Sequence, residues 1–227
     1  MTYTDLSENL NNYLEIYKSG LKKQANAKIS EIVSYICDLP NNDRDSILFR
    51  FLSDYCDNHI WDSLKHRGNG DIPYHLKEYI LSWLTPRCEE KKMPELRWYY
   101  EMFVHHKVGY EYALKYLECA YLSKECDQKT VDLLFDSYID TLAWGAHHFP
   151  DGCIIEAETK NFCIQKCEEI LNEKQVSEHL VYQLKYYKIL YMCYEKYVKD
   201  GRTEDFDNYL NEANIDFYYT KAYYYQK

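Results

Sequence analysis

The chain has few residues that break secondary structure, with only seven glycines and five prolines among 227 residues. It also lacks the strict alternation of apolar and polar residues that indicates strands. Apolar residues recur instead at intervals of three and four along almost the whole chain, as in Leu6, Leu10 and Leu14. The sequence therefore predicts an all-α fold of about ten helices in antiparallel pairs.

Long apolar runs are missing as well. No stretch of 18 apolar residues occurs, so no transmembrane helix and no membrane partner are expected. The first residues, Met1 to Glu8, have neither the positive start nor the apolar centre of a secretory signal peptide. We therefore expect a cytoplasmic protein whose nine cysteines are reduced thiols.

Basic residues are fewer than acidic ones. The chain has 27 lysines and arginines against 37 acidic residues, which gives a formal net charge of −10. Direct binding of nucleic acid requires clustered lysine and arginine and is not expected. A basic partner protein fits this charge, because opposite fields accelerate encounter, although acidity also serves solubility alone.

Signatures of common enzyme chemistry are absent too. The sequence contains no glycine-rich phosphate loop, no dinucleotide-binding fingerprint and no His-Glu-x-x-His motif. We therefore assign no cofactor, no metal and no catalytic residue.

Local signals predict several helix ends. A helix is expected to end before Pro86, Asp127 to cap a helix, Ser177 to open the longest helix, of about 23 residues, and Thr203 to cap the last one. We expect a single helical domain over residues 1–227. The charged loop at 87–93 is a candidate seam between an N-terminal helical part and a C-terminal repeat-like part.

One predicted helix carries small residues around a large one, namely Ala113, Leu117 and Ala120. Small residues at this spacing let a second helix approach closely. Together with the preceding segment around Trp98, this stretch resembles a tetratricopeptide repeat, although the expected Leu-Gly pair and a strict 34-residue period are missing. The resemblance implies an α-solenoid that grips a peptide or protein, and the alternative is an irregular helical bundle.

Polar and aromatic residues beside this stripe are candidates for the partner-binding surface, because exposed aromatic and arginine side chains anchor interfaces. The candidates are Arg97, Trp98, Glu101, His105 and Tyr112. In the alternative interpretation, Trp98 belongs to the core and Arg97 forms an ordinary i,i+4 pair with Glu101.

A second candidate site is the segment 144–153. Its residues Trp144, His147, His148 and Asp151 suit a partner-binding loop, since loops at helix ends often carry function. A structured loop without a ligand is the plainer interpretation.

The same segment permits a metal- or thiol-dependent enzyme that uses His147, His148 and Cys153. Cys163 and Cys167, four residues apart on the next predicted helix, could add two thiolates to a zinc site. The favoured hypothesis is still a non-enzymatic interaction module. One example is an immunity- or inhibitor-type protein that masks a basic toxin such as a nuclease.

Overall fold

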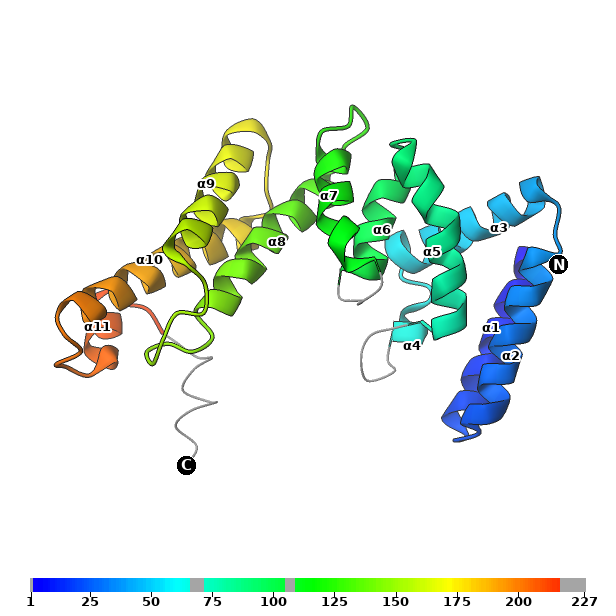
Figure 1. Cartoon of the computed structure of the whole chain (residues 1–227), viewed down its shortest axis with the longest axis horizontal. Coiled ribbons are helices and arrows are strands. Elements are labelled where there is room, and N and C mark those ends of the chain that lie inside the picture. The colour runs from blue at the N-terminus through cyan, green and yellow to red at the C-terminus, as the bar shows by residue number, and fades with distance from the viewer. Residues whose placement is uncertain (1, 66–71, 105–108, 217–227) are drawn as a thin grey trace. The chain divides into compact units, whose positions relative to one another are not determined.

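The computed structural model describes residues 2–65, 72–104 and 109–216 (Figure 1). Within these ranges the chain forms eleven α-helices and one π-helical turn, and no strand. The all-α class and the expected number of about ten helices are thus confirmed. The bounds are α1 (Tyr3–Lys18), α2 (Lys22–Cys37), α3 (Asn41–Leu52), η1 (Ser53–Asp57), α4 (Asp62–Lys65), α5 (Tyr74–Glu89), α6 (Glu95–Phe103), α7 (Tyr110–Tyr121), α8 (Gln128–Gly145), α9 (Ala157–Glu173), α10 (Glu178–Lys199) and α11 (Phe206–Glu212).

The helices divide into two compact units, Met1–Ala120 and Tyr121–Lys227. In the first unit, α1 packs against α2, α2 against α5, and α5 against α6. In the second unit, α8 packs against both α9 and α10, and α10 also packs against α11. The candidate seam at 87–93 lies inside the first unit, at the end of α5 and in the turn that follows it. In the described part of the chain, no helix is long and apolar enough to cross a membrane.

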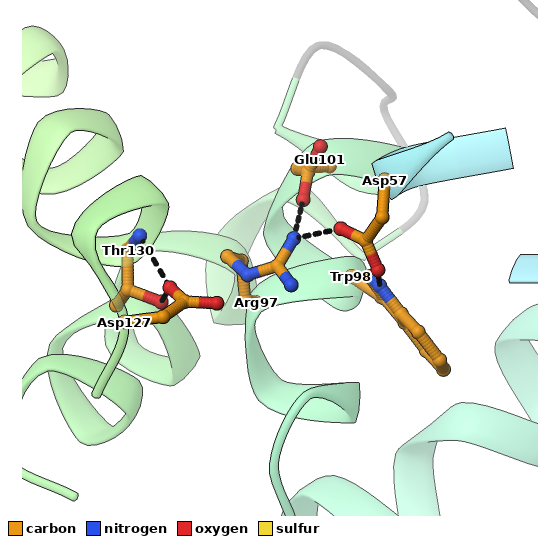
Figure 2. A network of polar contacts seen from close by, with 6 residues as sticks. All are labelled: Asp57, Arg97, Trp98, Glu101, Asp127 and Thr130. Carbon is orange, nitrogen blue, oxygen red and sulfur yellow. Dashed lines mark hydrogen bonds and ion pairs between the residues drawn. The ribbon is translucent and has the colours of Figure 1, made fainter. Parts of the chain in front are cut away.

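Two of the predicted helix starts are confirmed. The Asp127 carboxylate accepts hydrogen bonds from the backbone N–H of Thr130 at 2.8 Å and from its hydroxyl at 2.6 Å, which caps α8 (Figure 2). Ser177 precedes α10, which at 22 residues is the longest described helix. The apolar periodicity of this segment was a sufficient signal because neighbouring helices cover it on more than one side.

Two other helix ends differ from the prediction. Helix α5 continues through Pro86 to Glu89, and the Glu90 N–H donates to the Pro86 carbonyl at 3.1 Å. Proline has no N–H to donate to the Ser82 carbonyl one turn earlier, and the helix ends three residues after it, at Glu89. Helix α11 is capped by Asp205 and not by Thr203, because the carboxylate of Asp205 accepts from the Asp207 N–H at 3.0 Å.

Helices α8 and α10 approach each other closely at Gly145. A methyl group on Gly145 would lie 2.2 Å from the Tyr191 hydroxyl and 2.5 Å from a side-chain carbon of Ile155. The same hydroxyl donates a hydrogen bond to the Leu142 carbonyl at 2.8 Å, so a side chain of α10 is tied to the backbone of α8. This contact fixes the spacing of the two helices that carry the candidate site.

All nine cysteines are free thiols. Five of them are buried and act as small apolar core residues. Only two are exposed, Cys37 and Cys153.

Candidate functional site

A groove with a volume of about 450 Å³ lies between α8 and α10 in the second unit. Asp136, Asp140 and Trp144 recur every four residues on α8 and so share one stripe of that helix. We call this cavity the α8–α10 groove. It is lined by Asp136, Ile139, Asp140, Ala143, Trp144, Ala146, His147, Gln183, Tyr186 and Tyr187.

Negative charge accumulates on the α8 side of the groove. Burial raises the pKa of the Asp136 carboxyl above its ordinary value, and the nearby carboxylates of Asp140 and Asp132 raise it further, while His179 opposes them. Asp132 is held by Ser177, whose N–H and hydroxyl donate to it at 3.0 Å and 2.6 Å. Within the described residues, no lysine or arginine forms an ion pair with Asp136. This carboxylate is therefore partly desolvated, and no lysine or arginine of the described ranges compensates its charge.

Aromatic rings form the rest of the wall. The indole of Trp144 is 60% exposed and stacks on the imidazole of His147, with ring centres 5.7 Å apart and planes 6° from parallel. On α10, the rings of Tyr186 and Tyr187 meet edge to face at 5.1 Å. A large, exposed tryptophan beside carboxylates is an unusual surface for a protein that needs only solubility.

Several predicted residues lie in or near this groove. Trp144 and His147 line it, and the His148 ring meets the His147 ring edge to face at 5.2 Å. Asp151 lies in the exposed turn that follows, where its carbonyl accepts from the Arg202 guanidinium at 3.2 Å. The structure thus brings His147 and His148 together beside Trp144.

The other group of predicted residues is found in the first unit. Arg97 is buried, and one nitrogen of its guanidinium lies 2.7 Å from Asp57 and 2.5 Å from Glu101 (Figure 2). The indole N–H of Trp98 donates to the second oxygen of Asp57 at 2.9 Å. Burial and these contacts give the three residues a role in the core of the unit. A direct contact of Arg97, Trp98 or Glu101 with a partner stays a prediction.

Two further residues were predicted for the partner-binding surface, Tyr112 and His105. Tyr112 is exposed on α7, with its ring stacked on that of Tyr116 at 6.1 Å. His105 lies outside the described residues.

Two of the three thiols at or near the second candidate segment are buried. Burial raises the pKa of Cys167 to about 12 and also raises the pKa of Cys163, so both stay protonated near neutral pH. The exposed Cys153 thiol donates to the Ile155 carbonyl at 3.2 Å. Across residues 2–65, 72–104 and 109–216, no three side chains of His, Cys, Asp or Glu are grouped so as to hold a metal ion.

Comparison with known proteins does not identify a family for this chain. No protein-family model, curated protein or solved structure matches the chain. The resemblance to tetratricopeptide repeats therefore stays a prediction.

Sequence reasoning missed most of the groove. Asp136 and Asp140 precede Trp144 at two successive intervals of four residues, and this stripe was visible in the sequence. The groove wall that α10 forms was not visible in the sequence, because Tyr186 and Tyr187 belong to a helix with aromatic residues on several sides. Which of these tyrosines meets α8 depends on how the two helices pack.

Proposed function

We propose that this protein is a non-enzymatic interaction module whose α8–α10 groove binds a basic segment of a partner protein. The observation that supports this most is the Asp136 carboxylate. It is partly buried in the groove, which the exposed Trp144 also lines, and no lysine or arginine within the described residues pairs with it.

The groove offers what a lysine or arginine side chain requires. A guanidinium or ammonium group forms short, charge-assisted hydrogen bonds with carboxylates such as Asp136 and Asp140. The flat face of Trp144 attracts a cation through its ring electrons, and a second arginine of the bound segment would stack well on such a face. An acidic or purely apolar segment would instead bury the Asp136 charge without a partner, which is strongly unfavourable.

The partner class that fits is a protein with a basic surface. The net charge of −10 accelerates the approach of such a partner. Enzymes that act on nucleic acids carry basic surfaces because they bind phosphates. An immunity- or inhibitor-type protein that masks a nuclease toxin is therefore the specific form of this proposal.

A fluorescent peptide of alternating arginine and glycine provides a first test, measured by fluorescence anisotropy. We expect it to bind the intact protein and to shift towards weaker affinity by about tenfold when NaCl rises from about 0.02 M to about 0.5 M. The same peptide with glutamate in place of arginine should not bind, and binding of both peptides with equal affinity would contradict the proposal.

Matched variants separate binding in the groove from general attraction to an acidic protein. Asp136→Asn should weaken binding of the arginine peptide by about tenfold, because it removes a charge-assisted contact. Glu204→Gln removes one exposed carboxylate of the same unit outside the groove and should change the affinity less than twofold. Equal losses in the two variants would rule out the groove as the binding site.

A further inference from the structure

A second cavity, in the first unit, has the opposite electrostatic character. It lies between α3 and α5 and has a volume of about 380 Å³. We call it the α3–α5 pocket. It is lined by Asn41, Arg44, Asp45, Tyr79, Ser82, Trp83, Pro86 and Arg87. Two arginines thus meet in one pocket of a chain that has ten more acidic than basic residues.

The single carboxylate of the pocket is already fully engaged. One oxygen of Asp45 accepts from the indole N–H of Trp83 at 2.8 Å, and the other lies 2.7 Å from the Arg87 guanidinium. Arg87 also lies over the Trp83 ring at 3.9 Å and donates to the Trp83 carbonyl at 3.0 Å. Asp45, Trp83 and Arg87 therefore form a rigid, nearly neutral wall, and Asp45 is not available to neutralise Arg44.

Arg44 is the other arginine of the pocket, and it is not paired with Asp45. Its guanidinium donates to the side-chain oxygen of Asn41 at 2.5 Å and lies beside the Tyr79 hydroxyl. Both partners are neutral groups. Among residues 2–65, 72–104 and 109–216, no carboxylate forms an ion pair with Arg44. Most of the five guanidinium N–H donors of this side chain are therefore open to a ligand.

Further donors stand beside this guanidinium. The side-chain amide of Asn41 lines the pocket and has N–H groups to offer. Helix α3 starts at Asn41, and no side chain caps its first turn. The backbone N–H groups of that turn add a positive partial charge near the pocket.

We propose that the α3–α5 pocket binds a small oxyanion, a phosphate or carboxylate group, through the guanidinium of Arg44. Arginine presents its N–H groups in a fork that matches two oxygens of such an anion. Tyr79, Trp83 and Pro86 supply an apolar wall for the carbon skeleton that carries the anion. This site is independent of the α8–α10 groove, because it uses other residues, another unit and the opposite charge.

The test uses the intact protein with its four tryptophans labelled with ¹⁵N, so that each indole N–H gives one NMR signal. The Trp83 signal, assigned with the variant Trp83→Phe, should move in a saturable manner as inorganic phosphate is added at constant ionic strength. Acetate and chloride serve as parallel titrants. Movement with acetate alone identifies a carboxylate site, and movement with phosphate alone identifies a phosphate site.

Arg44→Gln should lower the apparent affinity for the anion by at least about tenfold, and Arg44→Lys should restore part of it. Arg50→Gln removes the same charge from the same helix, outside the pocket, and should leave the affinity unchanged. The proposal is overturned if no titrant moves the Trp83 signal, or if Arg44→Gln and Arg50→Gln respond alike. Movement of the Trp144 signal, by contrast, reports on the α8–α10 groove alone.

Discussion

At the scale of single residues, contacts within one helix could be predicted from the sequence and contacts between distant segments could not. The pair of Arg97 and Glu101 follows from their spacing of four residues, and the structure contains it. Asp57 lies 40 residues before Arg97, and no periodicity in the sequence predicts that the two residues form an ion pair. It is nevertheless this residue that bridges Arg97 and the Trp98 indole, so the core role of Trp98 depends on a contact that only folding creates.

Asp136 provides a prediction at this scale. Its pKa is raised in the folded protein, so the folded state binds the proton of this carboxyl more tightly than the unfolded state does. The stability that this proton contributes is therefore lost as the pH rises from about 4 through the raised pKa. We therefore expect Asp136→Asn to raise the free energy of unfolding at pH 7, with the gain over the wild type vanishing below about pH 4. Urea unfolding followed by circular dichroism at several pH values measures this.

The matched control is again Glu204→Gln, which should change the free energy of unfolding by less than about 0.5 kcal/mol. A loss of stability in Asp136→Asn at pH 7 would mean that the carboxylate is held by contacts within the fold. Greater stability together with weaker binding of the arginine peptide is instead the expected signature of a residue kept for binding.

At the scale of elements, helix existence was predictable and helix packing was not. Apolar periodicity and the capping residue Asp127 placed the start of α8 correctly in the sequence. Pro86 misled because proline marks the neighbourhood of a helix end here and not the end itself, and α5 continues through it to Glu89. The close approach of α8 and α10 could not be predicted, because a lone glycine such as Gly145 does not reveal which side chain will meet it.

Gly145→Ala tests this approach. Helix propensity alone favours alanine over glycine by about 1 kcal/mol. The new methyl group, however, would overlap the Tyr191 hydroxyl and Ile155, and overpacking of this kind typically costs about 1–3 kcal/mol, in addition to any loss of the bond from Tyr191 to Leu142. We expect a net loss of about 1–3 kcal/mol in the free energy of unfolding, measured by urea denaturation.

Gly152→Ala is the control for this change, since nothing lies within 4 Å of the position that its methyl group would take. This second variant should unfold within about 0.5 kcal/mol of the wild type. An equal or greater stability of Gly145→Ala would show that α8 and α10 can move apart without loss.

At the scale of the whole molecule, composition predicted the all-α class, since scarce glycine and proline leave long helical segments uninterrupted. The division into Met1–Ala120 and Tyr121–Lys227 was not foreseen, because no glycine-rich or proline-rich linker marks it. The candidate site was foreseen only in part. Trp144 and His147 were found from their neighbours in sequence, whereas the α10 wall depends on tertiary packing.

The distribution of thiols gives a prediction for the molecule as a whole. Brief treatment of the native protein with iodoacetamide should modify Cys37 and Cys153 first, because they are exposed. Cys56, Cys88, Cys163, Cys167 and Cys193 should react only after unfolding, since they are buried. Peptide mass spectrometry measures both sets, and guanidinium-unfolded protein, in which all nine should react, is the control. Rapid modification of Cys167 in the native protein would contradict the packing of α9 described above.

The environment of Asp136 also has a consequence for the history of this chain. A substitution to asparagine is a small genetic change, and by the argument from its pKa it should leave the fold more stable at neutral pH. Random drift removes such a residue within a lineage unless selection for some use retains it. If relatives of this protein keep an acidic residue at this position while the exposed acidic residues around it vary, selection has retained the carboxylate for a function other than stability.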